Sequence, residues 1–242
     1  MDKQIVYYTD NLVDQKIANV VRYCLRQTGL PIVYVSLGEP IGFSTNLTIY
    51  RERGVLTMFR QIYYGLMKCE LDIVFLAEHD ILYHPSHFEF TPPDDGKIYY
   101  NTNVWQLRSL DGHAVFYTAK RVSQLCGYRE VLLKHYRKRV ETVEKDGFSM
   151  KMGYEPGTHH RKERVDNLES GEWFSRWPNI DIKHGRNLSP ARWSPSEFRS
   201  QRNCRNWAEA DEIPPWGHSG GRFDAFIQDV YHSTGEKENG LS

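Results

Sequence analysis

The chain of 242 residues is long enough to bury a hydrophobic core, and its length suits one large domain or one domain with an appended subdomain. Hydrophobic residues make up 40% of it and charged residues 26%, as is ordinary for a soluble globular protein. Its 31 basic side chains balance its 31 acidic ones, so the net charge indicates no class of partner. No segment is apolar over the length that crossing a membrane requires.

Cysteine usage favours a reducing compartment. The four cysteines are widely spaced and form no CxxC pair, which argues against a zinc site and against a disulfide framework. The first residues enter a strand pattern directly, so no signal peptide is expected. We therefore expect a cytoplasmic protein.

The first hundred residues alternate between strand and helix patterns. Strands are expected over residues 5–9 and 31–36, helices over 12–26 and 57–68, and a third strand from residue 71 to the polar residues at 78–80. This β-α-β-α-β order predicts a parallel sheet whose ligand crevice lies at the carboxyl ends of its strands. Polar loops follow all three strands, which predicts a binding site at that edge.

Beyond residue 90 the alternation weakens. Short strands are expected over 97–101, 104–107, 114–118 and 179–184, a long basic helix over 119–145, and a polar loop over 147–172. We divide the chain into an α/β half (1–110), a second half of the same domain that completes the site (111–232), and a flexible tail (233–242).

An acidic motif ends the third strand. Glu78 and Asp80 are spaced i, i+2, and residues two apart in a strand point to the same side. Two carboxylates on one side suit a hard divalent cation, which prefers oxygen ligands. The alternative interpretation is a solvated acidic strand end.

The whole pattern resembles the nucleotide-sugar glycosyltransferases of the GT-A fold. The resemblance rests on the α/β half, on Glu78-His79-Asp80 and on a histidine far downstream, His184. It implies a Rossmann-type central mixed sheet flanked by helices, followed by a helical and loop-rich acceptor region. It also implies a divalent metal, Mn²⁺ or Mg²⁺, that bridges the phosphates of a UDP-linked sugar donor. The family motif is Asp-x-Asp, so Asp80 is the firmer ligand, Glu78 departs from the pattern, and His184 completes the site.

Other side chains are candidates for binding the donor. Thr9, Asp10 and Asn11 can hydrogen-bond a pyrimidine edge or a ribose, although Asp10 and Asn11 also suit the start of a helix. Glu39 and Arg60 are further candidates. Arg186 is placed to offset the charge of the departing diphosphate.

The base that would deprotonate the acceptor is expected in the polar segment 153–160. Glu155 is the first candidate and His159 the second, because an inverting transfer needs a carboxylate or histidine to take the proton of the acceptor hydroxyl. An ordinary Pro-Gly turn with a neighbouring histidine pair, His159-His160, explains the segment equally well. A retaining transfer would not need this base.

Two basic blocks, within 120–139 and 183–205, fit either one anion-binding face or two solvated helix faces, and the first interpretation predicts an anionic acceptor. A hydroxymethylated base in DNA suits them, as in the small phage-type enzymes that look similar, and it would have to be flipped out to react. Such an enzyme would act in the cytoplasm of a bacterium or a phage-infected host. A saccharide acceptor is the main competitor. A sugar nucleotidyltransferase and a non-catalytic nucleic-acid-binding module remain as alternatives.

Overall fold

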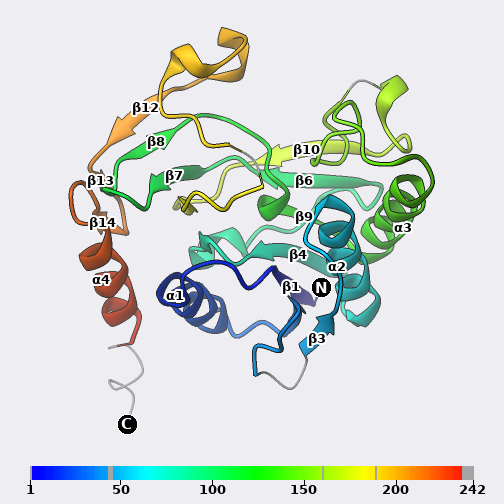
Figure 1. The fold of residues 1–242 in the computed structure, drawn as a ribbon, viewed down its shortest axis with the longest axis horizontal. Coiled ribbons are helices and arrows are strands. Elements are labelled where there is room, and N and C mark those ends of the chain that lie inside the picture. Colours follow the sequence, from blue (N-terminus) through cyan, green and yellow to red (C-terminus); the bar gives the residue numbers. More distant parts are fainter. Residues whose placement is uncertain (1, 43–45, 160, 189, 236–242) are drawn as a thin grey trace.

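A seven-stranded sheet forms the centre of the fold (Figure 1). The computed structural model describes residues 2–42, 46–159, 161–188 and 190–235. The strands of this sheet, in their spatial order, are β10 (Glu169–Trp173), β6 (Lys97–Asn101), β9 (Leu125–Tyr128), β4 (Ile73–Glu78), β1 (Lys3–Thr9), β2 (Ile32–Leu37) and β3 (Asn46–Ile49). The four strands from β4 to β3 run parallel, whereas β9 runs antiparallel to both β4 and β6. The predicted mixed α/β sheet is confirmed.

Two helices cover each face of this sheet. The helices are α1 (Gln15–Arg26), α2 (Val55–Lys68), α3 (Arg129–Asp146) and α4 (Phe223–Gly235). Successive residues of a strand point to opposite faces, so Tyr7 of β1 packs with the face that α1 and α4 cover, and Val6 with the face that α2 and α3 cover. Burial on both faces explains why β1 and β4 are almost continuously apolar. No helix in the described part of the chain is long and apolar enough to cross a membrane.

A second, five-stranded sheet joins the two halves of the chain. Its strands, in their spatial order, are β12 (Ala208–Ala210), β8 (Ala114–Phe116), β7 (Val104–Arg108), β11 (Asn179–Lys183) and β5 (Ile81–Leu82), and a separate ribbon pairs β13 (Glu212–Ile213) with β14 (Gly217–His218). Asp181 of β11 pairs with Ile81 of β5, the residue directly after Asp80. This pairing brings the end of β11 to the acidic end of β4.

The structure differs from the sequence-based expectation in several elements. The helix expected over 119–145 begins only at Arg129, because residues 125–128 are buried in the central sheet as β9. The helix expected from residue 12 begins at Gln15, where the Asp14 carboxylate accepts from the Lys16 N–H. Strand β10 begins inside the segment expected to be a loop, 147–172, and extends one residue beyond it. Helix α4 was not expected and reaches residue 235, inside the expected tail, whose residues 236–242 lie outside the described part.

Gly65 allows α2 to lie close against the central sheet. A Cβ atom at this position would lie 2.5 Å from Val6 Cγ1 and 3.1 Å from Val35 Cγ2. We therefore expect Gly65→Ala to lower the free energy of unfolding by about 1–3 kcal/mol, because overpacking outweighs the gain of about 1 kcal/mol in helix propensity. Urea denaturation measures this change. Met67→Ala, at an exposed position of the same helix, is the control, and a more stable Gly65→Ala variant would contradict the expectation.

Candidate active site

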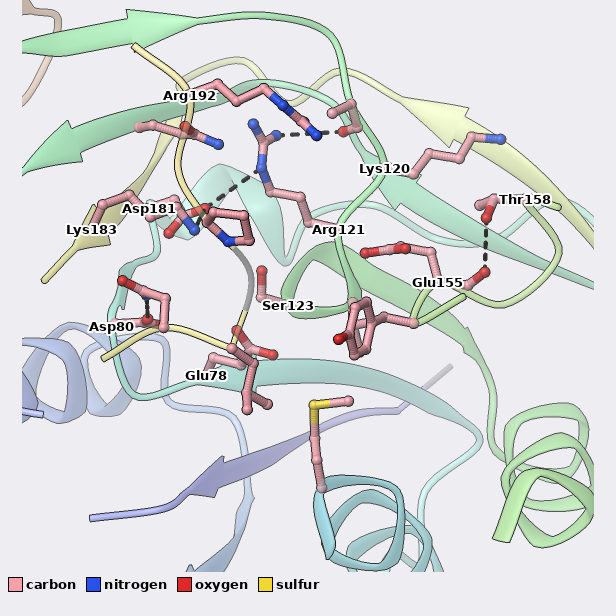
Figure 2. Close-up of a pocket in the computed structure, with 18 of the residues that line it drawn as sticks. Glu78, Asp80, Lys120, Arg121, Ser123, Glu155, Thr158, Asp181, Lys183 and Arg192 are labelled. Carbon is pink, nitrogen blue, oxygen red and sulfur yellow. Dashed lines mark hydrogen bonds and ion pairs between the residues drawn. The ribbon is translucent and has the colours of Figure 1, made fainter. Parts of the chain in front are cut away.

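A cavity of about 1260 Å³ opens at the carboxyl ends of β1 and β4. Residues 78–80 line it on the side of the central sheet (Figure 2). The second sheet contributes side chains of β7 and β11, and the β8–β9 connection contributes Lys120 to Ser123. Residues of α2, of β10 and of segments 150–159 and 190–205 also line it. The cavity therefore lies at the strand edge that the sequence predicts as the binding site.

Asp80, His184 and His79 converge beside this cavity. Each offers one ligand atom, and these atoms all lie within 4.8 Å of one another. His184 Nε2 lies 3.4 Å from Asp80 Oδ2, although the residues are far apart in sequence. Asp80 Oδ1 and His184 Nε2 are both buried and have no hydrogen-bond partner among the described residues. A buried carboxylate oxygen without a hydrogen bond, next to an imidazole nitrogen that faces the same carboxylate, fits a divalent metal such as Mn²⁺.

The turn after β11 holds this group together. The Asn187 side-chain amide donates to Asp80 Oδ2 at 2.7 Å, and the His184 backbone N–H donates to Asn187 Oδ1 at 3.0 Å. Gly185 within the turn has φ +78°, a conformation that glycine adopts without strain. Burial by itself would raise the pKa of Asp80, but the adjacent His184 and the charges of His79 and Lys183 hold it below its usual value. The carboxylate therefore stays ionised.

Glu78 lies outside this group. Its carboxyl accepts a short hydrogen bond from the Tyr8 hydroxyl, and burial, followed by the charge of Asp80, raises its pKa to about 8. Strand β4 ends at Glu78, so the side-chain alternation behind the i, i+2 expectation does not continue to Asp80. His79 is the third member instead, and its Nδ1 lies 2.8 Å from Thr9 Oγ1. The strand alternation was expected to continue as far as Asp80. Had the strand been expected to end at Glu78, His79 would have been a candidate ligand.

The predicted nucleotide-binding residues of β1 are close to this group. Thr9 and Asp10 line the cavity, and Asp10 Oδ2 accepts from Arg53 Nε at 2.6 Å. The Asn11 side-chain amide donates to the carbonyls of Leu37 and Glu39, so it joins the loops that follow β1 and β2. The Glu39 side chain is exposed and does not line the cavity.

Two other candidates for donor binding lie away from the main cavity. Arg60 forms an ion pair with Glu144 at 2.7 Å and thereby links α2 to α3. Arg186 donates to the Leu12 carbonyl at 3.0 Å and lines a separate cavity of about 390 Å³, next to residues of α1 and α4. His184 also borders this second cavity.

Glu155 and His159 both line the main cavity. Burial raises the pKa of Glu155, and burial together with the positive charge of Arg139 lowers the pKa of His159. Their loop is held by buried Arg139, which donates to the carbonyls of Gly153 and Tyr154 at 2.9 Å each. His160, named with His159 in the sequence, lies outside the described residues.

The second sheet contributes polar residues that the sequence did not single out. Asp181 Oδ2 lies 2.8 Å from Lys183 Nζ and 3.5 Å from Arg121 Nε. Burial opposes the charge of Lys183, but Asp181 and Asp80 raise its pKa above the ordinary value. Gln106 pairs in register with Asp181, and Gln106 Oε1 and Asp181 Oδ1 are buried without a partner in the described chain. The sequence signal that could have singled them out is the pair Asp181 and Lys183, two charged residues spaced i and i+2 in a mostly buried strand.

Three comparisons relate the chain to known proteins. No protein-family model matches the sequence, and a search of curated proteins found no match. Similar solved structures include the glycosyltransferase GlyE of Streptococcus pneumoniae, with 9% identity, coverage of 70% of this chain and 45% of that one, and a TM-score of 0.44. The Drosophila β-1,4-galactosyltransferase 7 mutant, in complex with manganese, UDP-Gal and xylobiose, has 10% identity, coverage of 83% and 81%, and a TM-score of 0.42.

These two structures, to which the chain is similar at low identity, are glycosyltransferases. The chain spans less than half the length of GlyE. It is also similar to the inositol-1-phosphate CTP transferase of T. maritima, with 12% identity, coverage of 78% of this chain and 92% of that one, and a TM-score of 0.41. Because TM-scores below 0.5 leave the activity open, the chemistry of the site has to decide between functions.

Proposed function

We propose that the protein is a metal-dependent glycosyltransferase that moves a sugar from a nucleotide-sugar donor, UDP-linked, to a hydroxyl acceptor. The observation that carries this proposal is the meeting of Asp80 and His184, whose buried Oδ1 and Nε2 atoms make no hydrogen bond within the described chain, beside a cavity lined by Thr9 and Asp10. A metal group next to polar loop residues suits a diphosphate with a nucleotide attached.

In this proposal Asp80, His184 and His79 hold Mn²⁺ or Mg²⁺. The bound ion would supply positive charge to the diphosphate leaving group. Lys183 places a further positive charge near Asp80. Glu78, expected from the sequence as a ligand, would join them only after losing both its proton and its hydrogen bond to Tyr8.

Thr9 and Asp10 bind the nucleotide in this proposal, and Asn11 fixes the loops that present them. Glu155 takes the proton of the acceptor hydroxyl if the transfer inverts, because its carboxylate lines the cavity and its raised pKa makes it a better base. His159 is the second candidate for this role. Glu39, Arg60 and Arg186 receive no direct role, since none of them lines the main cavity.

The finer parts of the proposal are a cytoplasmic location and a hydroxymethylated base in DNA as acceptor. The four cysteines of the chain are free and buried, which fits a reducing compartment. The DNA acceptor is supported only by the basic blocks of the sequence, and a saccharide acceptor competes with it.

A donor screen tests the proposed function. The protein is incubated with a panel of sugar nucleotides and Mn²⁺, Mg²⁺ or EDTA, with hydroxymethylated DNA or oligosaccharides present, and the products are identified by mass spectrometry. We expect release of the nucleoside diphosphate from one donor, dependent on the metal. Pyrophosphate release from a nucleoside triphosphate and a sugar phosphate would favour the nucleotidyltransferase instead, and no turnover of any sugar nucleotide would contradict the proposal.

A further inference from the structure

Four arginines line the main cavity and have no carboxylate partner in the described part of the chain. We call Arg192, Arg199, Arg202 and Arg205 the arginine wall. Within the described residues none of them forms an ion pair, whereas Lys120, Arg121 and Lys183 of the same cavity each face an acidic group. Residues 190–207 contain a single acidic residue, Glu197, and its carboxylate accepts from the Trp193 backbone N–H. The wall therefore carries uncompensated positive charge.

An aromatic cluster anchors the segment that carries the wall. Tyr117 contacts Phe198 edge to face at 4.9 Å and stacks on Trp207 at 5.9 Å between ring centroids. The Arg192 guanidinium lies 4.8 Å from the centre of the Phe198 ring. The Thr118 N–H donates to the Arg205 carbonyl at 3.0 Å, which ties the end of the wall to the second sheet. Four like charges are thus held at one side of a cavity, which costs electrostatic energy unless an anion binds there.

The wall and the proposed nucleotide site belong to opposite sides of the cavity. Thr9 ends β1 and Asp10 follows it, whereas the wall precedes β12, and Figure 1 shows β12 and β3 on opposite sides of the molecule. Figure 2 draws Arg192 and Arg121 at the end of the pocket away from Glu78. Arg121 Nη2 is buried with no hydrogen-bond partner in the part of the chain that is described. Arg121 and Arg192 therefore lie on the side of the cavity away from Glu78, and in our proposal the acceptor binds on that side.

We infer that the acceptor carries phosphodiesters and that the arginine wall, with Arg121, binds them. This inference rests on the proposed function, because it assigns the acceptor of the same site. Guanidinium groups match phosphate oxygens through paired hydrogen bonds, and several of them in a row suit a chain of phosphates better than a single one. A nucleic-acid strand and a phosphate-bearing saccharide polymer both offer this chemistry.

Binding is measured by fluorescence anisotropy with a labelled oligothymidylate and, separately, with labelled poly(glycerol phosphate), both in EDTA and with UDP and Mn²⁺ present. With five phosphate contacts, four from the wall and one from Arg121, we expect the affinity to fall about 130-fold between 50 and 200 mM salt. The double variant Arg199→Gln/Arg202→Gln removes two exposed members of the wall, and its affinity should fall only about 18-fold over the same range. The control is Lys134→Gln/Arg137→Gln, which removes the same charge from the exposed surface of α3 and should behave as wild type.

Each outcome decides the inference. Binding of either polymer that weakens in the wall variant supports it, and the polymer that binds more tightly identifies the source of the phosphodiesters. Binding of neither polymer, or equal binding by the wall variant and wild type, overturns it. If the wall variant loses affinity for UDP instead, the wall serves the donor, so the inference fails while the proposed function stands. A failed donor screen with intact polymer binding would overturn the proposed function, and with it the role of the polymer as acceptor, but would leave the arginine wall as a polymer-binding site.

Discussion

Replacing Asp80 with asparagine is expected to lower metal-dependent turnover of the sugar nucleotide by at least about 100-fold. A metal ion contributes several kcal/mol to stabilising charge on a leaving group, and each 1.36 kcal/mol corresponds to about tenfold in rate. Asp80 is the only carboxylate in the described group of ligands, so the change removes its negative charge while keeping its shape. Initial rates with the donor found in the screen measure the effect.

Metal binding gives a second measurement of the same variant. Mn²⁺ should raise the melting temperature of the wild type, because an ion that binds only the folded state stabilises it, and this increase should disappear in Asp80→Asn. Asp95→Asn is the matched control, since Asp95 is exposed and does not line the cavity. Turnover and a metal-induced shift that both stay within about twofold of wild type would show that Asp80 does not hold a metal.

The position of the cavity could be predicted because it depends on rules that act locally. Each parallel strand of the first half places a polar loop at the same edge, and the structure shows Thr9, Asp10 and Asp80 lining one cavity there. The approach of His184 to Asp80 was implied by a family resemblance, and the pairing of β11 with β5 is its physical cause.

The choice between Glu78 and His79 could not be made from the sequence. It depends on where β4 ends and on the Tyr8 hydroxyl, which comes from the neighbouring strand and occupies the Glu78 carboxyl. The ion-pair partners of the basic residues could not be predicted from the sequence either. Arg60 was a candidate for donor binding, but Glu144 on a helix far along the chain is its partner.

The long basic helix was misjudged for a related reason. Residues 119–128 read as the start of α3, but Leu125 and Cys126 are buried in the gap between β4 and β6. Tertiary burial thus overrides a helical pattern. Lys120 and Arg121 therefore line the cavity instead of lying on the surface of a helix. These two residues of the first basic block can contact a ligand in the cavity.

Acidification is expected to destabilise the protein through His87, which is fully buried in the core. The side-chain amides of Asn101 and Asn179 lie 3.0 Å from its Nδ1, so this nitrogen accepts and the ring is neutral. Burial lowers the pKa of His87 from its ordinary value of 6.5 to about 3. Above pH 6.5 the folded and unfolded chains are both neutral here, and the full stability is present. As the pH falls from 6.5 towards 3, only the unfolded chain takes up the proton, and stability is lost.

At pH 4 this linkage amounts to about 3 kcal/mol of the free energy of unfolding. Urea denaturation at pH 7 and pH 4 measures it in wild type and in His87→Gln, whose side-chain oxygen can still accept from both asparagines but does not titrate. The variant should lose about 3 kcal/mol less than wild type between the two values. Part of the dependence remains, because burial also lowers the pKa of His135. His218→Gln, at an exposed position, should keep the wild-type difference, and an equally large loss in His87→Gln would show that His87 is not its source.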